Sequence, residues 1–189
     1  FRRCALETIE RGDTWGREAV VTAEPTQAGQ MAKIFGYMKG LHATHLIHVG
    51  VQLGLFEHLA KESGGLLPET LARVLGLHAP YVQLWCETAC GLELLDLDPK
   101  SGYRLAPYME ELLGQPQGTF YLGGFPDAHL QLTRDYAHYS ERFRTGGTGS
   151  YQAHEEEFMR SVASATQTLP RMFLDAVMPK LPALQARLV

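Results

Sequence analysis

Three histidines spaced three residues apart could bind a metal ion. His42, His45 and His48 lie in a segment with helical periodicity, so neighbouring pairs would be close enough to share one ion. A step of three residues drifts around a helix, however, and the segment from His42 to His48 contains no aspartate or glutamate. The spacing therefore favours histidines partly buried at a helix interface, and we expect no metal site.

Two other groups of reactive side chains have an ordinary structural explanation. Cys86 and Cys90 are one turn apart on a predicted helix, where small buried cysteines are the common case. Glu155, Glu156 and Glu157 would suit a general base or a cation site. Carboxylates near a helix start are usually solvated and favoured by the helix dipole. We expect no catalytic residue in either group.

An aromatic-rich set surrounds two glycine-bearing loops in the second half of the chain. Ligand pockets are mostly apolar with a few well-placed polar groups. Core packing is the alternative explanation of such a set. The candidate pocket residues are Tyr121, Phe125, His129, Tyr151, His154, Phe158 and Met159.

Helices are predicted for most of the chain between residues 30 and 92. The apolar residues of this region recur at helical spacing, and proline opens two of the segments. The predicted helices cover residues 31–49, 53–59, 68–75 and 80–92. Before them, residues 1–29 are weakly patterned, which is typical of a leader that packs on another surface or frays.

The apolar period changes to nearly two after Gly91. Residues 92–97 and 103–105 flank a turn-forming pentapeptide at 98–102, which predicts a β hairpin. Helix, short helix, turn, helix and hairpin, in that order, form the winged version of the helix-turn-helix unit. The expected fold class is therefore mainly α with a small β hairpin: a winged-helix domain followed by a helical segment.

The remaining sequence predicts more helices. One apolar stripe consists of Leu132, Tyr136, Tyr139 and Phe143, and the other of Tyr151, His154, Glu155, Phe158 and Val162. The expected division is a leader at 1–29, a winged-helix domain at 30–115 and a helical segment at 116–189.

A winged helix raises the question of DNA binding, which the charges answer. The chain has a net charge of −4, and residues 66–105 contain three basic and five acidic side chains. The helix at 80–92, which would enter the major groove, has no lysine or arginine to reach phosphates. Nucleic acid is therefore not an expected partner. The competing interpretation is a winged-helix transcription regulator whose helical tail is an effector or dimer module.

Composition indicates a cytoplasmic protein that does not enter a membrane. No apolar run approaches the roughly 20 residues that span a bilayer. The charged start at residues 1–4 has no apolar core behind it, unlike a secretory signal. Three cysteines, an odd number without a pairing pattern, fit a reducing compartment.

Several segments of the chain share their pattern with a known enzyme family. They are GYM at residues 36–38, GVQLGLFEHLA at 50–60, the stretch from LPETLARV to MEELL at 67–113, and the segment from YLGGF to LPAL at 121–184. Together they resemble the N-terminal region of S-adenosylmethionine-dependent class I methyltransferases of the O-methyltransferase type. The sequence departs from the usual pattern at Leu67, where a Ser, Thr or Asp helix cap is expected.

The resemblance implies a division of roles. In that family a winged-helix region precedes a Rossmann-like catalytic domain and commonly forms the homodimer interface, while a helical connector roofs the pocket for a small-molecule acceptor. The broad apolar face of the first helix would be buried in such a dimer. The candidate interface residues are Met31, Ile34, Phe35, Met38, Leu41 and His45.

The cofactor site of that family has no counterpart in this sequence. Its S-adenosylmethionine site needs an apolar strand that runs into a glycine-rich turn at a helix start. The nearest candidate, Gly146–Gly149, follows a helical stripe and predicts a loop. The chain ends about where the first catalytic strand would start. We therefore expect the parent enzyme to use S-adenosylmethionine, and this chain alone to lack the catalytic domain and bind no cofactor.

Overall fold

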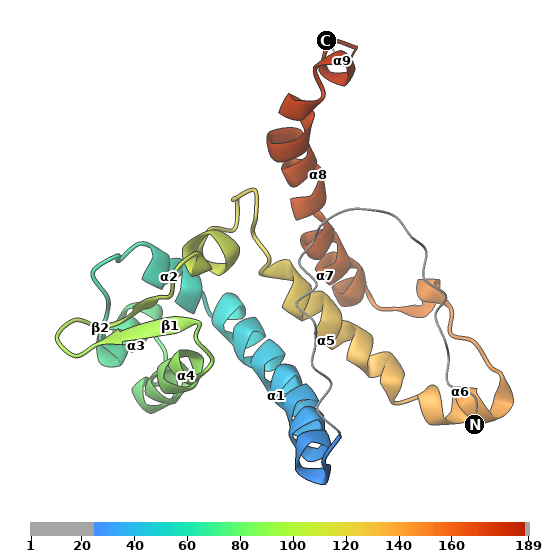
Figure 1. Ribbon diagram of the computed structural model, residues 1–189, viewed down its shortest axis with the longest axis horizontal. Helices are drawn as coiled ribbons and strands as arrows, with labels where there is room; N and C mark the ends of the chain where they lie inside the picture. Colours follow the sequence, from blue (N-terminus) through green and yellow to red (C-terminus); the bar gives the residue numbers. More distant parts are fainter. Residues whose placement is uncertain (1–24, 188–189) are drawn as a thin grey trace. The chain divides into compact units, whose positions relative to one another are not determined.

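The computed structural model describes residues 25–187, and most of the predicted leader at 1–29 lies outside them. Two units divide between Tyr37 and Met38. The long helix α1, Gln27–Gln52, begins in the first unit and continues into the second (Figure 1). Among the described residues, no helix is long and apolar enough to cross a membrane.

The hydrophobic core lies in the first half of the second unit. Its elements are α2 (Leu55–Ala60), α3 (Pro68–Leu75), α4 (Ala79–Gly91), β1 (Leu95–Asp98) and β2 (Gly102–Leu105). Phe56 is fully buried and meets the Trp85 ring edge-on, with 5.1 Å between ring centroids. The Trp85 indole N–H donates to the carbonyl of Leu46 at 3.0 Å. This bond satisfies the one polar atom of the indole while its apolar body fills the core, and it ties α1 to α4.

Local signals explain the bounds of α3 and α4. Pro68 and Pro80 both occupy the first turn of their helices, where the lack of an N–H costs nothing. Gly76 ends α3 with φ of 67°, a conformation that glycine adopts without steric cost. Leu67 precedes α3 without a side-chain capping bond, as its type predicts. The predicted helix at 68–75 is confirmed, and the one at 80–92 is shifted by one residue.

The predicted hairpin is also confirmed. β1 and β2 pair antiparallel, with Leu95 opposite Leu105 and Leu97 opposite Tyr103. In the turn, Asp98 accepts hydrogen bonds from the N–H groups of Lys100 and Ser101, which lower the pKa of the Asp98 carboxyl.

Gly102 allows a third segment to join the hairpin. The backbone of Leu66 exchanges two 2.8 Å hydrogen bonds with Tyr103. Gly102 has φ of 92°, and a Cβ atom there would collide with the Leu66 carbonyl. Only glycine fits this close backbone approach without strain.

The second half of the chain is a succession of helices with short 3₁₀ and π turns. In order, these are η1 (Glu110–Gly114), α5 (Gly124–Tyr136), α6 (Tyr139–Thr145), η2 (Tyr151–Ala153), α7 (Glu156–Thr166), α8 (Thr168–Met172), η3 (Phe173–Val177), η4 (Met178–Lys180) and α9 (Pro182–Gln185). α5 lies against α7 (Figure 1).

The prediction of one helix through Leu132, Tyr136, Tyr139 and Phe143 is wrong. The structure has two helices, α5 and α6, separated by a turn, and this stripe is exposed. α5 instead buries Gly124, Ala128 and Gln131. A Cβ atom on Gly124 would meet the backbone at Ser164 of α7, so the close approach of the two helices selects small residues. Large aromatic side chains are left on the outside.

The predicted helix from Tyr151 to Val162 begins later than expected. Tyr151–Ala153 form a 3₁₀ turn, His154 and Glu155 are extended, and α7 starts at Glu156. Hydrogen bonds from the His154 ring to neighbouring elements favour this extended stretch. The expected position of the glutamates at a helix start is confirmed, since Glu156 and Glu157 lie in the first turn of α7.

Candidate functional site

An apolar cavity of about 400 Å³ is the candidate for a ligand site. It lies within the second unit and is bounded by α1, the region after α4, the segment around η1 and the start of α5. Its lining residues are Thr44, Ile47, Leu94, Met109, Leu112, Leu113, Leu122, Phe125, Pro126 and His129. The volume is in the range of small-molecule sites, and no lining residue is an acid, a lysine or an arginine.

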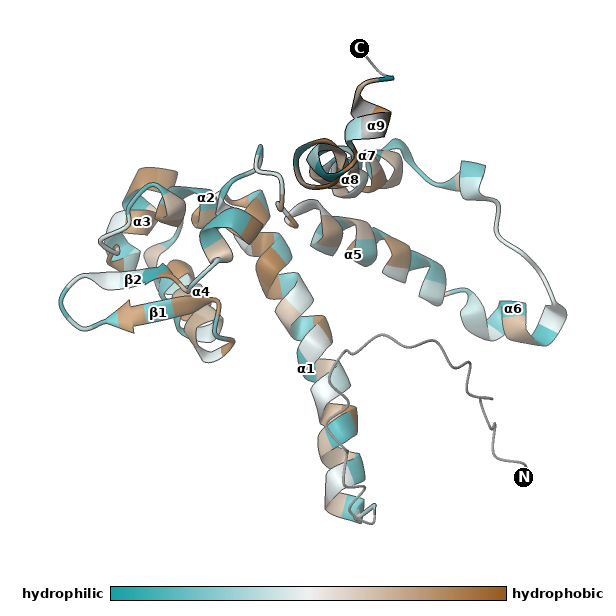
Figure 2. Ribbon diagram, turned by 45° about the horizontal axis from the view of Figure 1, so that its top comes forward, coloured by the Kyte–Doolittle hydropathy of each residue, from teal (hydrophilic) through white to brown (hydrophobic). Residues whose placement is uncertain are grey.

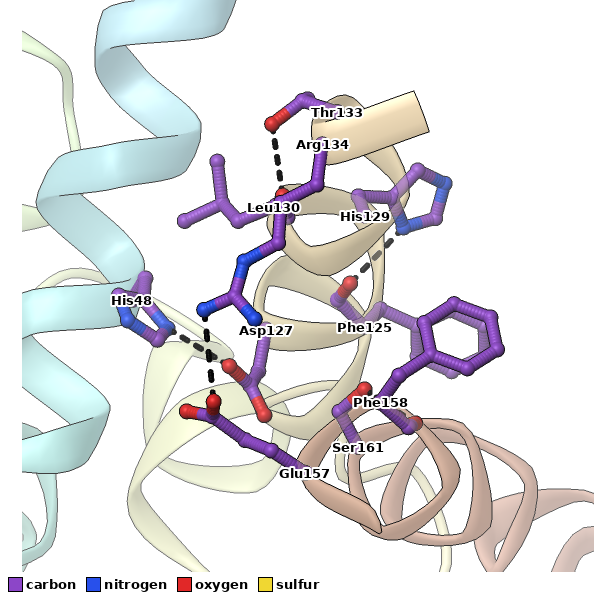
Figure 3. A network of polar contacts seen from close by, with 10 residues as sticks. All are labelled: His48, Phe125, Asp127, His129, Leu130, Thr133, Arg134, Glu157, Phe158 and Ser161. Carbon is purple, nitrogen blue, oxygen red and sulfur yellow. Dashed lines mark hydrogen bonds and ion pairs between the residues drawn. The ribbon is translucent and has the colours of Figure 1, made fainter. Parts of the chain in front are cut away.

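The two polar side chains of this cavity are bonded to their own helices. The His129 ring places Nδ1 2.8 Å from the carbonyl oxygen of Phe125, one turn earlier in α5 (Figure 3). The Thr44 hydroxyl donates to the carbonyl of Gly40 in α1 at 2.9 Å. Because these bonds fix the orientation of both groups, the cavity presents a preformed surface.

A polar contact next to the cavity connects α1 to α5. Nδ1 of His48 lies 3.5 Å from the Asp127 carboxylate, and both side chains are half-buried (Figure 3). Farther along α5, Arg134 reaches Glu157 of α7 at 3.3 Å. The first contact joins the cavity-bearing start of α5 to α1, and the second joins the far end of α5 to α7.

The three histidines of α1 do not converge on one point. His42 and His45 are exposed, whereas His48 turns to Asp127. Within residues 25–187, no group of three or more His, Cys, Asp or Glu side chains is placed to hold a metal ion.

A second cluster joins three of the predicted pocket residues. The His154 ring stacks on Phe158 with 4.1 Å between centroids, and Tyr151 meets Phe158 edge-on at 5.5 Å. Both His154 ring nitrogens face oxygen acceptors: Nδ1 lies 2.8 Å from the Tyr151 carbonyl and Nε2 lies 3.0 Å from the Asp135 carboxylate. Arg142 also approaches Asp135, at 3.8 Å.

The protonation state of His154 follows from this geometry. A neutral imidazole has one N–H, so both contacts are hydrogen bonds only when the ring is an imidazolium. The bonds to Tyr151 and then Asp135 raise the pKa of His154, while partial desolvation and the nearby charge of Arg142 oppose the increase. When it is protonated, the ring links the end of α5 to the segment before α7.

We expect the stability of the protein to fall as the pH rises through the raised pKa of His154. The stabilisation is fully present below the ordinary histidine value of about 6.5 and is lost above the raised value. Urea unfolding measures the free energy of unfolding at pH 6 and at pH 8.5. The difference between these two free energies should be smaller for His154→Gln than for the wild type. The matched variant His78→Gln should keep the wild-type difference. An unchanged difference in His154→Gln would refute this role.

The structure distributes the seven predicted pocket residues over several places. Phe125 and His129 line the cavity, and Tyr151, His154 and Phe158 form the stacked cluster. Tyr121 is separate: burial, with a smaller effect from the Glu57 charge, raises the pKa of its hydroxyl. Met159 is exposed.

Most of the cavity-lining residues were not predicted. Eight of them are absent from the aromatic set, including Thr44 and Ile47 of α1 and three leucines around η1. One signal was available: Thr44 and Ile47 are three residues apart and lie on a different face of the helix from the Met38–Leu41–His45 stripe.

Cys86 is structural. It is fully buried, and burial, with smaller contributions from the charges of Glu87 and Glu69, raises its pKa to about 12. A thiol with that pKa stays protonated at neutral pH and is a poor nucleophile and metal ligand. The prediction of a buried cysteine at this position is confirmed. Cys90 is partly buried.

The candidate interface residues share one exposed face of α1. The exposed fractions of Phe35 and Met38 are 61% and 53%. Apolar residues recur along the whole length of the helix, well beyond its contact with the core (Figure 2). Met31, Ile34, Leu41 and His45 are exposed as well. Such a run of exposed apolar side chains is unusual for a surface that stays in water.

No protein-family model matches the sequence, and no curated protein matches it. Solved structures do match its fold. Human N-acetylserotonin methyltransferase, in complex with SAM, superposes with a TM-score of 0.60 at 17% identity, over 80% of this chain and 47% of that protein. N,N-8-amino-8-demethyl-D-riboflavin dimethyltransferase (RosA) from Streptomyces davawensis superposes with a TM-score of 0.62 at 18% identity, over 79% of this chain and 46% of that protein. For the SAM-dependent methyltransferase SibL the TM-score is 0.54 at 22% identity, over 78% of this chain and 48% of that protein.

The chain shares the fold of part of these methyltransferases. It spans less than half of the length of each of the three proteins. The likeness therefore concerns a mainly helical region with a two-stranded antiparallel sheet, and the activities named for those proteins belong to the whole enzymes.

Proposed function

We propose that this chain is the N-terminal, non-catalytic part of a methyltransferase that uses S-adenosylmethionine to modify a small-molecule acceptor. The observation that carries the proposal is the apolar cavity of about 400 Å³, whose lining includes no acid, lysine or arginine, in a fold shared with methyltransferases. In this proposal α1, η1 and α5 supply part of the acceptor pocket. The proposed division is a leader at 1–29, a winged-helix domain at 30–115 and a helical connector at 116–189.

The proposed winged-helix domain at 30–115 includes most of α1, then α2, α3, α4, the β1–β2 hairpin and η1, and its role is dimerisation. The exposed apolar face of α1 supports a homodimer, because burying that face removes several large side chains from water. As a cytoplasmic enzyme subunit, the protein would then meet a small acceptor in solution.

The alternative function, DNA binding as a transcription regulator, is less favoured because of the side chains that α4 exposes. Tyr81, Leu84 and Glu87 are exposed there, and the helix has no basic side chain to contact phosphates. An apolar and acidic face suits contact with protein and repels a nucleic acid backbone.

The methyl donor is proposed to bind to another part of the parent enzyme. Gly146 ends α6 with φ of 70°, and its N–H donates to the Arg142 carbonyl, so the glycine cluster caps a helix. A donor site of the expected kind would need a glycine turn between a strand and a helix start. Among the described residues, the strands are β1 and β2, and the turn at 98–102 joins them to each other and does not lead into a helix.

An uncharged apolar probe tests the proposed pocket. We expect 2-methoxynaphthalene to perturb the methyl NMR signals of Ile47, Leu112 and Leu122. Leu122→Trp, which fills the cavity, should weaken this binding at least tenfold, roughly the effect of losing one buried side chain's contacts. Leu132→Trp, the same change on the exposed face of α5, should leave it unaltered. Probe binding only at the other apolar cavity, around Val49 and Val82, would contradict the proposal.

A further inference from the structure

The loop at residues 115–121 joins two walls of the apolar cavity. Leu112 and Leu113 of η1 precede this loop and line the cavity, and Leu122, directly after the loop, lines it as well. The backbone N–H of Leu122 donates to the carbonyl of Leu112 at 2.8 Å, which closes the loop at its base. Because both walls are attached to the loop, a change in its conformation moves one wall relative to the other.

Thr168 of α8 anchors the end of this loop. Its hydroxyl donates to the carbonyl of Tyr121, which is 47 positions earlier in the sequence. Thr168 is only 4% exposed, whereas the other residues of α8 are half-buried or exposed. Loss of this donor would leave the Tyr121 carbonyl without its partner, which is costly in a partly buried place. The bond therefore ties Tyr121, the residue directly before the cavity wall at Leu122, to α8.

Arg171 and Asp175 hold the rest of the loop. The Arg171 guanidinium donates to the carbonyl of Pro116 at 3.1 Å and to the side-chain oxygen of Gln117 at 2.9 Å. A guanidinium presents its donors in fixed directions, so this fork fixes two consecutive residues. One turn later, Asp175 of η3 accepts a hydrogen bond from the Thr119 hydroxyl at 2.6 Å.

These contacts lie outside the cavity. Of the described residues that line it, none belongs to α8, to η3 or to the 115–121 loop. A change in the side chains of α8 therefore reaches a bound molecule only through the walls that the loop connects. Side chains of this kind support a site without touching its ligand.

We infer that Thr168 and Arg171 are positioning residues of the proposed acceptor pocket, and that Thr168 has the larger effect because its bond is partly buried. By holding the loop between η1 and α5, the helix α8 determines the shape of a pocket that it does not line. This inference rests on the proposed function, because it takes the apolar cavity as the acceptor pocket. It goes further by naming the side chains through which a C-terminal helix controls that pocket.

An isosteric substitution at Thr168 tests the inference by NMR titration with 2-methoxynaphthalene. Thr168→Val keeps the shape of the side chain and removes its donor. We expect this variant to bind the probe about fivefold more weakly and to exchange the Leu122 amide hydrogen about fivefold faster, the ratio that one net hydrogen bond gives. Thr168→Ser, which keeps the hydroxyl, should restore both values. The matched control is Thr166→Val, at an exposed hydroxyl bonded within α7, and it should change neither value.

Arg171→Met tests the second anchor. It removes both bonds to the loop and keeps an apolar stem, so it should change both values in the same direction as Thr168→Val, by a smaller factor. Arg160→Met, which breaks an exposed ion pair with Glu156 in α7, should change neither. Hydrogen exchange of the Tyr103 amide, which is bonded to Leu66 in the core, should stay the same in all these variants, because only the loop is released.

The outcomes separate the two claims. If the wild type does not bind the probe at the cavity, the proposed function fails and this inference fails with it. The proposed function stands and the inference alone is overturned by any of three results in a wild type that binds. These are equal affinity of Thr168→Val, failure of Thr168→Ser to restore binding, and an increase in exchange at Tyr103 as large as that at Leu122.

Discussion

Replacing Phe35 and Met38 together with aspartate is expected to convert dimers of this chain into monomers. Both side chains are more than half exposed on the same face of α1, where an apolar partner surface would cover them. Burying three or four such side chains contributes on the order of 5–10 kcal/mol before the costs of association. Two carboxylates at the centre of that interface, repeated on the partner, would reverse the balance. Light scattering measures the result directly.

The matched control is the double variant Phe143→Asp and Met159→Asp. It makes the same two exchanges at exposed positions of α6 and α7, and it should remain dimeric. Circular dichroism shows whether each variant keeps its helices. A wild-type chain that is monomeric at high concentration, or a dimer that survives the α1 substitutions, would contradict the proposed interface.

Phe56→Ala should be the most destabilising single substitution that truncates a side chain in the core. The ring is fully buried, meets the Trp85 ring edge-on and lies where a Cβ atom on Gly50 would collide with it. Removing a buried phenylalanine costs about 3–5 kcal/mol, because the transfer free energy is lost and a cavity remains. This is a large part of a typical domain stability of about 5–15 kcal/mol.

Urea unfolding of Phe56→Ala and Phe143→Ala measures the contrast. Phe143 is 89% exposed, so its truncation should change the free energy of unfolding by no more than about 0.5 kcal/mol. Similar losses in the two variants would show that the core is not centred on Phe56.

Local chemistry explains why the first half of the fold was predictable. Pro68 and Gly76 bracket α3 at the predicted residues, and the pentapeptide at 98–102 forms the turn between β1 and β2. Each signal acts within a few residues: proline sets φ, glycine permits a positive φ, and Asp98 caps a turn. Such signals do not depend on what packs against them.

Tertiary packing explains why the second half of the fold was less predictable from the sequence. In α5 the large residues form an apolar stripe, yet the close approach to the α7 backbone is at Gly124, and the side chain that α5 buries next is the small Ala128. Periodicity ranks side chains by hydrophobicity and is blind to how closely two backbones approach. His154 shows the same limit, because its contact with Asp135 joins residues 19 positions apart in the sequence.

The candidate site was predicted only in part for a related reason. Phe125 and His129 belonged to a recognisable aromatic set, whereas Thr44, Ile47 and the leucines near η1 are ordinary helix residues whose role depends on the fold. A cavity whose walls come from residues 44–129 has no local pattern.

The proposed function divides the work between two parts of the parent enzyme: these helices shape the acceptor pocket, and the methyl donor binds elsewhere. Calorimetric titration of the chain with S-adenosylmethionine tests this proposal most directly, with 2-methoxynaphthalene as the positive control for a folded pocket. We predict no saturable binding of S-adenosylmethionine up to about 1 mM, equivalent to a binding free energy weaker than about −4 kcal/mol. Micromolar binding of S-adenosylmethionine by this chain alone would contradict the account.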